Sequence, residues 1–269
     1  MFKPYASLLE GKIAHEARQA VLLDNPIAVG AVGGSGTRIL AQILAEAGVA
    51  MATPSNDAHD ALEWPPMHPI IHTDKLQSMP LETRLRAAFW GLEFLLLKRR
   101  EQLGLSGRTG WKVPATHLWL RELADYFPAI QYIHIIRNGL DMAYSGNQRQ
   151  LSMWGEYVGL HTQFDDTGRA AAGDAMEYWL IANEKAMEVG APLEGQFLLV
   201  RYEALCQAPD SELERIFSFL ELDIDVAERA ALADRIRPTA TLNRFRHHKW
   251  RDDFTQVQLQ RLEALGYRP

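Results

Sequence analysis

The stretch Ala28-Val-Gly-Ala-Val-Gly-Gly-Ser-Gly-Thr37-Arg38 decides the fold, because it has the pattern of a buried strand that ends in a glycine-rich turn. A periodic apolar run from Ile39 to Ala47 follows the turn and predicts a helix. Glycines let the backbone approach an anion, and the first turn of a helix offers N–H groups that lack a partner within the helix. The stretch therefore predicts a strand, an anion-binding turn and a helix.

A second stretch repeats this pattern about a hundred residues later. It is Tyr132-Ile-His-Ile-Ile-Arg137-Asn-Gly-Leu-Asp-Met-Ala-Tyr-Ser145, in which an apolar strand ends at Arg137 and leads into a helix. Arginine can grip a phosphate through two parallel hydrogen bonds, and a helical rise of about 1.5 Å per residue keeps Ser145 within reach of the same group. The alternatives are that Arg137 pairs with Asp141 and that Ser145 faces solvent. Two anion sites in one chain favour a ligand with a phosphate at each end.

With these two stretches, the chain resembles the cytosolic and bacterial sulfotransferases that use 3′-phosphoadenosine 5′-phosphosulfate (PAPS). In that family a Ser-Gly-Thr turn holds the 5′-phosphosulfate, and an Arg and a Ser spaced eight apart hold the 3′-phosphate. Ser35-Gly36-Thr37 matches the first motif, and Arg137 with Ser145 matches the second. The likeness extends from about Ile27 to Lys249. It implies a P-loop-like fold, PAPS as sulfuryl donor and adenosine 3′,5′-bisphosphate (PAP) as product.

The resemblance also implies roles for single residues. Lys112, at the end of an apolar strand, corresponds to a lysine near the reaction centre, and Tyr202 corresponds to a tyrosine that contacts adenosine. The basic segment around Arg244 and Arg246 loosely resembles the segment that closes over the 3′-phosphate. The cofactor-binding residues expected on this basis are Gly33, Gly34, Ser35, Gly36, Thr37, Arg38, Arg137, Ser145, Tyr202, Arg244 and Arg246.

Two positions depart from the family pattern. Gly34 stands where a Lys or Arg commonly neutralises charge on the departing phosphate, so we expect Arg38 and Lys112 to share that role. Pro114 stands where the cytosolic members have a catalytic histidine, so the general base must lie elsewhere. His117 is the nearest histidine and is the predicted catalytic residue; the alternatives are His68, His72, Asp57, Asp60 and Glu63.

Apolar runs alternate with helical periodicity along the chain, which predicts an α/β fold with a doubly wound, mainly parallel sheet flanked by helices. The expected strands are 26–32, 49–52, 110–113, 131–136 and 196–200, and the expected helices are 38–47, 117–127, 140–150, 175–188 and 211–220. We expect a single domain over residues 1–269. The segments 53–80, 154–173 and 238–253 do not fit this rhythm, and we expect them to wall the acceptor pocket and cover the cofactor.

Composition excludes several other classes. The net charge of −6 disfavours nucleic-acid binding, and no apolar run approaches the roughly 20 residues that cross a membrane. Lys12, His15, Glu16 and Arg18 interrupt any signal-like apolar core, and the single cysteine, Cys206, fits a reducing compartment, so we expect a cytoplasmic protein. No cysteine cluster or His-Glu-x-x-His motif occurs, so no metal site is predicted. The expected partner is a small-molecule acceptor, and the sequence does not indicate the oligomeric state.

Two other functions remain open at this stage. A nucleotide-dependent kinase is disfavoured because Thr37 directly follows Gly36, where a phosphate-binding loop would carry a lysine. A non-catalytic protein that binds PAP or PAPS remains possible because Gly34 and Pro114 replace two residues of the catalytic pattern.

Overall fold

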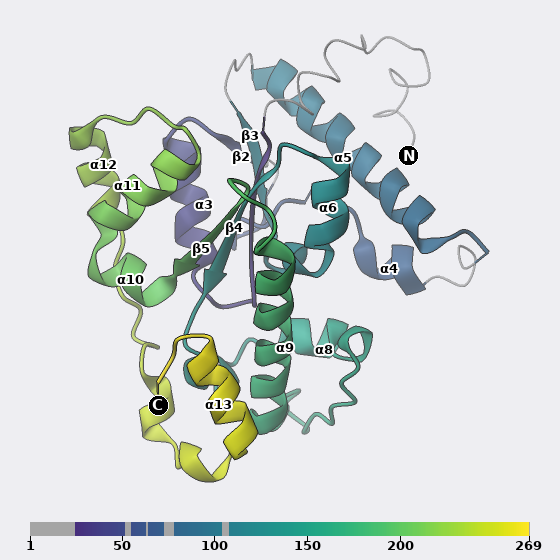
Figure 1. The fold of residues 1–269 in the computed structure, drawn as a ribbon, viewed down its shortest axis with the longest axis vertical. Helices are drawn as coiled ribbons and strands as arrows, with labels where there is room; N and C mark the ends of the chain where they lie inside the picture. Colours follow the sequence, from purple (N-terminus) through teal and green to yellow (C-terminus); the bar gives the residue numbers. More distant parts are fainter. Residues whose placement is uncertain (1–24, 52–54, 63, 73–77, 104–107, 269) are drawn as a thin grey trace.

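The computed structural model describes residues 25–51, 55–62, 64–72, 78–103 and 108–268. Five strands form one parallel sheet with the order β2-β3-β1-β4-β5 (Figure 1). They are β1 (Ile27–Ala31), β2 (Ala50–Met51), β3 (Thr109–Lys112), β4 (Gln131–Ile136) and β5 (Phe197–Arg201). The predicted doubly wound parallel sheet is confirmed. The predictions for Ala52, Glu63 and the N-terminal segment before residue 25 lie outside the described residues.

Helices cover both faces of the sheet because successive strand residues point to opposite faces. Val29 and Ile133 belong to one apolar core, whereas Ala28 and Tyr132 belong to the other. The first core is covered by α3 (Thr37–Glu46), α10 (Tyr202–Gln207), α11 (Pro209–Phe219) and α12 (Val226–Ala233). The second is covered by α5 (Leu81–Leu103), α6 (Leu120–Tyr126) and α9 (Ala172–Gly190). Burial on both faces explains why the strands are mainly apolar.

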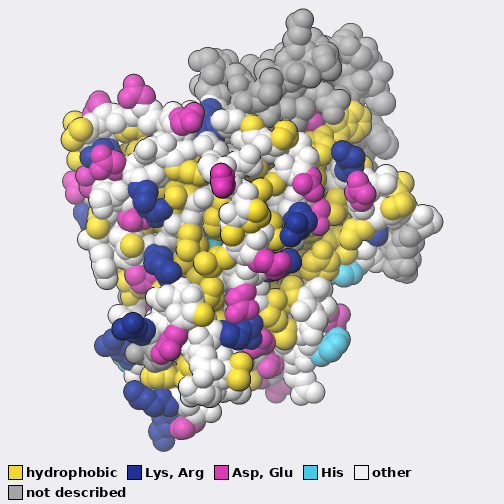
Figure 2. All heavy atoms as spheres, viewed as in Figure 1, with side chains coloured by type: hydrophobic (Ala, Val, Ile, Leu, Met, Phe, Trp, Pro, Cys, Tyr) yellow, Lys and Arg dark blue, Asp and Glu magenta, His cyan; other side chains and the backbone are white. Residues whose placement is uncertain are grey.

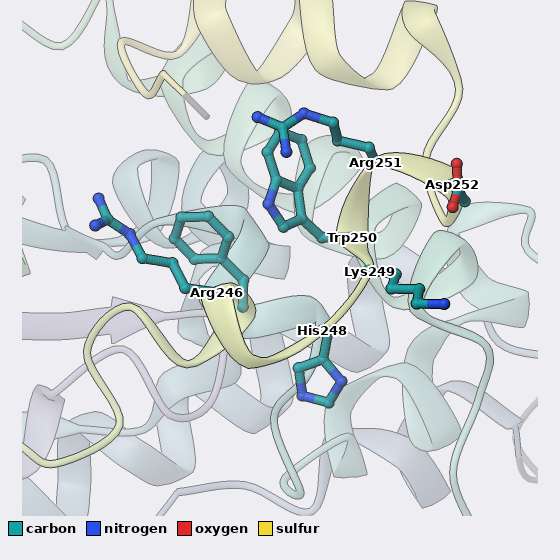
Figure 3. A pocket seen from close by; sticks show the side chains of 7 residues that line it. Arg246, His248, Lys249, Trp250, Arg251 and Asp252 are labelled. Carbon is teal, nitrogen blue, oxygen red and sulfur yellow. The ribbon is translucent and has the colours of Figure 1, made fainter.

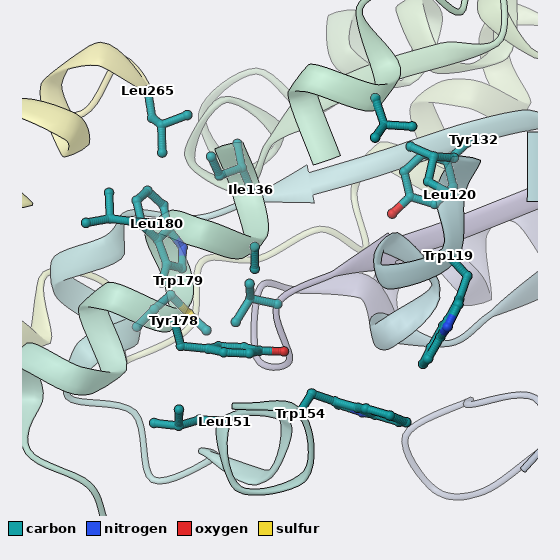
Figure 4. Packing of buried hydrophobic residues seen from close by; sticks show 14 of the residues in the cluster. Trp119, Leu120, Tyr132, Ile136, Leu151, Trp154, Tyr178, Trp179, Leu180 and Leu265 are labelled. Carbon is teal, nitrogen blue, oxygen red and sulfur yellow. The ribbon is translucent and has the colours of Figure 1, made fainter. Parts of the chain in front are cut away.

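The second core is built from large aromatic side chains (Figure 4). Trp119 lies against Trp154 with ring centroids 5.0 Å apart, and Trp179 lies against Tyr267 at 6.0 Å. A Cβ atom added to Gly139 would lie 2.7 Å from the Trp179 ring, so only glycine allows α7 (Gly139–Ala143) to sit this close to α9. This contact fixes the position of the residues that follow Arg137.

The strand order places the two sequence motifs side by side. From β1 the chain continues to β2 and β3 on one side, and from β4 it continues to β5 on the other, so the connections diverge between β1 and β4. Ala31 pairs with Ile135, so these two neighbouring strands end together. Ligands of open α/β sheets bind at such a divergence, beyond the carboxyl ends of the strands.

The helix predicted over residues 140–150 is wrong. The structure has α7 and then α8 (Arg149–Trp154), with Ser145 in the turn between them. The Ser145 N–H donates to Met142 O at 3.0 Å, a tighter turn than the α-helix makes. Gly146 follows, and glycine costs about 1 kcal/mol in a helix relative to alanine. The helix predicted over 117–127 likewise divides into the 3₁₀ helix η3 (Pro114–Trp119) and α6.

The three segments expected to form loops carry short helices. Segment 53–80 contains α4 (Met67–His72), and segment 154–173 contains η4 (Glu156–Val158). Segment 238–253 contains η5 (Arg244–His247) and η6 (Trp250–Asp252), and α13 (Gln256–Ala264) follows it. In the described part of the chain, no helix is long and apolar enough to cross a membrane.

Candidate active site

The glycine-rich turn connects β1 to α3 in a conformation that depends on glycine. Gly34 and Gly36 have φ of +99° and +95°, values that residues with a side chain rarely adopt. The Ser35 hydroxyl donates to Val32 O at 2.7 Å and holds the turn closed. Gly36 is the N-cap of α3, and among the described residues no side chain caps this helix and no acidic residue lies in its first turn. The helix start therefore offers uncapped N–H groups to an anion.

Gly36 also allows Tyr202 to pack against the turn. A Cβ atom added to Gly36 would lie 2.3 Å from the Tyr202 ring, so the ring lies directly against the glycine. The Arg137 guanidinium lies over the same tyrosine ring, 5.1 Å from its centroid. Burial raises the pKa of the Tyr202 hydroxyl, so it stays protonated at neutral pH. The structure thus brings Gly36, Tyr202 and Arg137, three of the predicted cofactor-binding residues, together at the turn.

Arg137 is buried at the end of β4, with 2% of its surface exposed, and faces the turn. Its Nη1 lies 3.5 Å from Gly34 O, and its Nη2 donates to Thr241 O at 2.5 Å and lies 3.3 Å from Asp141 Oδ2. The predicted alternative pairing with Asp141 therefore exists. Among the contacts of the described residues, the Arg137 Nε–H has no hydrogen-bond partner, although it is buried. An unpaired buried donor of a charged group is costly, so this atom fits an anionic ligand.

Ser145 also lies next to Gly34. A Cβ atom added to Gly34 would lie 3.7 Å from Ser145 Oγ and 3.3 Å from Met142 Cε. Ser145 Oγ accepts a hydrogen bond from Asn147 N at 3.2 Å and keeps its own proton for another acceptor. The second motif therefore meets the first although Ser145 is not helical. The same contacts explain the missing cation at position 34, because a side chain there would be strained and crowded.

The C-terminal segment is fixed to this site through Asp141. The buried carboxylate of Asp141 accepts hydrogen bonds from Asn243 N at 2.8 Å and from Phe245 N at 3.3 Å. Arg244 Nε donates to Thr241 O at 3.2 Å, the same carbonyl that Arg137 binds. Burial lowers the pKa of Arg244, and the nearby charge of Arg137 lowers it further. Two guanidinium groups this close together favour the binding of an anion between them.

A second group of charges surrounds Lys112 at the end of β3. Its ammonium group, with 2% of the residue exposed, donates to Ala58 O at 2.5 Å and forms an ion pair with Asp60. Burial lowers the pKa of Lys112, the Asp60 carboxylate opposes that shift, and the positive charge of Arg38 lowers it further. Arg38 is exposed on the first turn of α3. The two cations that sequence analysis expected to replace the one missing at Gly34 therefore influence each other.

His117 occupies a separate, buried position. Its Nε2 lies 3.4 Å from Gln150 Oε1, and Gln150 Nε2 donates to Ala31 O at 3.1 Å. Burial, assisted by the neighbouring His134, lowers the pKa of His117 to about 3. His117 is therefore neutral at neutral pH but a weak base. His134 pairs with Tyr132 and Asn183 inside the core, as expected for a structural residue.

Arg246 does not join the charges around Arg137 in any described contact. Its guanidinium lies 5.8 Å from the Phe245 ring centroid, in a groove of the C-terminal segment. Sequence reasoning also missed Thr241, and it gave Asp60 only as a possible base. Asp60 is 52 residues from Lys112 in the chain, and no local pattern indicates such a contact. The spacing of Arg137 and Asp141, four residues apart, did indicate their contact.

Comparisons with known proteins identify the family of this chain. A family model described as "Sulfotransferase family" matches residues 26–226. The chain belongs to the sulfotransferase family, and it has the transferase fold of that family. None of the curated proteins searched gives a significant match to the chain.

Solved sulfotransferase structures share the fold at low sequence identity. STF9 from Mycobacterium avium superposes with a TM-score of 0.57 at 14% identity, covering 98% of this chain and 80% of that one. The sulfotransferase domain from the curacin biosynthetic pathway gives 0.55 at 17% identity, covering 92% and 99%. The sulfotransferase domain of the Synechococcus PCC 7002 olefin synthase gives 0.53 at 17% identity, covering 91% and 97%. The family match favours a sulfotransferase over the kinase alternative.

Proposed function

We propose that this protein is a PAPS-dependent sulfotransferase acting on a hydroxyl or amine of a small-molecule acceptor. The observation that carries the proposal is the meeting of the two motifs at Gly34, which both Arg137 and Ser145 approach, together with the Nε–H of Arg137 that has no partner among the described residues. When bound, PAPS supplies the sulfuryl group and leaves as PAP. Arg137, Ser145 and Arg244 would hold the 3′-phosphate, and residues 33–38 would hold the 5′-phosphosulfate. Tyr202 would contact the adenosine.

The chain's own cations stabilise the negative charge that develops during transfer. Lys112 and Arg38 lie close enough for their charges to interact, and such preorganised charge is worth most in a buried site. The hydroxyl or amine of the acceptor forms the new bond to sulfur and must lose its proton. Asp60 is the candidate base that contacts Lys112; its side chain is 30% exposed, and its second oxygen, which accepts one hydrogen bond from Asn56 Nδ2 at 2.9 Å, has a further lone pair for that proton. His117 is the second candidate base.

No metal enters this proposal. Among the described residues, no group of three or more His, Cys, Asp or Glu side chains is arranged to hold a metal ion. Positive charge from Lys112, Arg38 and the turn N–H groups performs the role that a cation would have. We therefore propose that nucleotide binding proceeds without Mg²⁺.

Thermal unfolding with PAP, 5′-AMP and ATP tests the nucleotide assignment. A ligand at about a hundred times its Kd stabilises the native state by about 2.7 kcal/mol. For a chain of this size, that corresponds to a rise in Tm of roughly 5–10 °C. We expect PAP to give this rise without Mg²⁺ and 5′-AMP at the same concentration to give much less. Equal rises for PAP and 5′-AMP would contradict a 3′-phosphate site.

The non-catalytic alternative requires a separate measurement. Gly34 and Pro114 lack two side chains of the catalytic pattern, so PAP binding alone does not distinguish an enzyme from a binding protein. Transfer of labelled sulfate from PAPS to a panel of phenols, alcohols and amines makes that distinction. Transfer to any member supports the enzyme, and PAP binding without transfer across the panel supports the binding protein.

A further inference from the structure

The C-terminal segment carries a groove lined by positive charge (Figure 3). Residues 245–252 form this basic groove, which has a volume of about 610 Å³. Two aromatic rings, Phe245 and Trp250, form its frame, with centroids 5.9 Å apart in an edge-to-face arrangement. Arg246 lies over the first ring, and Arg251 lies over the second at 4.5 Å. These contacts hold the two guanidinium groups in place on a buried support.

The cations of the groove form no ion pair with the described part of the chain. Among the described residues, no carboxylate lies within ion-pair distance of Arg246, Lys249 or Arg251. Asp252 also lines the groove, and the neighbouring Asp253 accepts a hydrogen bond from Tyr144. The whole chain has a net charge of −6, so a surface with three unpaired cations stands out from the rest. Figure 2 shows Lys and Arg side chains gathered where Figure 1 draws this segment.

The arrangement of the cations favours an extended ligand. Arg246 and Arg251 extend to one side of the segment, whereas Lys249 extends to the other (Figure 3). A single small anion cannot bind all three at once. A lipid surface is also disfavoured, because the two aromatic residues of the groove, Phe245 and Trp250, are buried. A polypeptide with several carboxylates can follow cations that point in different directions.

We infer that the basic groove binds an acidic segment of a partner protein. The groove adjoins the candidate nucleotide site, because Phe245 N donates to Asp141 and the His248 ring stacks on Tyr144 at 3.9 Å. A partner bound there lies beside the residues to which the proposed function assigns the 3′-phosphate. The partner site itself does not depend on that function. Charge complementarity of this kind mainly directs encounter and orientation, so the binding weakens strongly as salt increases.

Fluorescence anisotropy with a labelled oligoglutamate peptide tests the inference. The protein is first saturated with PAP, so that the peptide cannot occupy the nucleotide site. The groove variant, Arg246→Gln/Arg251→Gln, removes the two cations that lie over the aromatic rings. The control variant, Arg86→Gln/Lys185→Gln, removes the same amount of charge from exposed ion pairs elsewhere on the surface. We expect the groove variant to weaken peptide binding about tenfold and the control variant to weaken it less than twofold. Unchanged thermal unfolding of both variants shows that the fold is intact.

Three outcomes would overturn the inference. One is equal weakening by the two double variants, which would mean that only the net charge matters. Another is competition by inorganic phosphate at concentrations similar to those of the peptide carboxylates, which would indicate a small-anion site. The third is groove-dependent binding to vesicles containing anionic lipid without binding to the peptide. Failure of PAP to bind in the first step would count against the proposed function alone, because peptide binding can be measured without PAP.

Discussion

Replacing Arg137 by glutamine should remove the preference for PAP over 5′-AMP. Glutamine is neutral and keeps an amide donor for Thr241 O, so the loss is mainly that of charge. Asp141 still accepts hydrogen bonds from Asn243 N and Phe245 N, so it does not become an isolated buried charge. The substitution therefore tests phosphate binding with limited damage to the fold.

The magnitude follows from the contacts of the guanidinium group. Its Nε–H has no partner among the described residues, and Nη1 has only a contact of 3.5 Å with Gly34 O. Two donors can therefore bind phosphate without losing a strong bond. A hydrogen bond to a charged group contributes roughly 1.5–3 kcal/mol, so two contribute at least about 3 kcal/mol. This corresponds to a loss of PAP affinity of roughly a hundredfold or more.

Isothermal titration of PAP and 5′-AMP provides the measurement. Arg215→Gln is the control, because Arg215 also binds a backbone carbonyl and a carboxylate but lies on α11. Ser145→Ala should cost only about 1 kcal/mol, the usual contribution of a neutral hydrogen bond. The reasoning is refuted if the Arg137 variant keeps the parental ratio of PAP to 5′-AMP affinity.

Three further substitutions test other parts of the site and core. Lys112→Ala should slow single-turnover transfer from PAPS at least about tenfold with a smaller change in PAP affinity; a near-parental rate would place the stabilising charge elsewhere. Gly36→Ala should lower Tm by more than Gly48→Ala, because both have positive φ but only Gly36 contacts Tyr202; equal losses would contradict that contact. Burial lowers the pKa of His134 to about 4, below its unfolded value near 6.5, so its contribution is complete above pH 6.5 and is lost as the pH falls. Burial also lowers the pKa of His117, to about 3, so urea unfolding should show a loss of about 4 kcal/mol between pH 7 and pH 5, of which His134→Asn removes about 2 kcal/mol.

The strands could be predicted from the sequence because burial on both faces favours apolar residues, such as Ile133 and Ile135, at most of their positions. The turn could be predicted because Gly34 and Gly36 are required by its positive φ values. The helix α5 was not predicted, although Leu85, Phe89, Leu92 and Leu96 recur at helical spacing and share one buried face. Trp90 lies in the same run but is 42% exposed, so the apolar residues of this segment do not all mark one face of a helix.

The contacts between distant segments could not be predicted. Thr241 is 104 residues from Arg137, and a backbone carbonyl that binds an arginine leaves no trace in residue type. Ser145 was predicted to lie in a helix, but α7 ends at Ala143, and Gly146, which disfavours a helix, follows Ser145. The spacing predicted only that Ser145 lies within reach of a phosphate bound by Arg137; its position beside Gly34 became known from the structure.

The hydrogen bonds from Asn243 and Phe245 to Asp141 have a consequence for synthesis of the protein. The five strands, the glycine-rich turn and the segment from Arg137 to Ser145 leave the ribosome before residues 241–245, which contact Arg137 and Asp141. Domains begin to fold from the N-terminal side as the chain emerges. A nascent chain that ends near residue 226 thus contains the whole region of the family match but lacks Thr241, Arg244 and the donors to Asp141. The site can reach its final form only after residues 241–245 have left the ribosome.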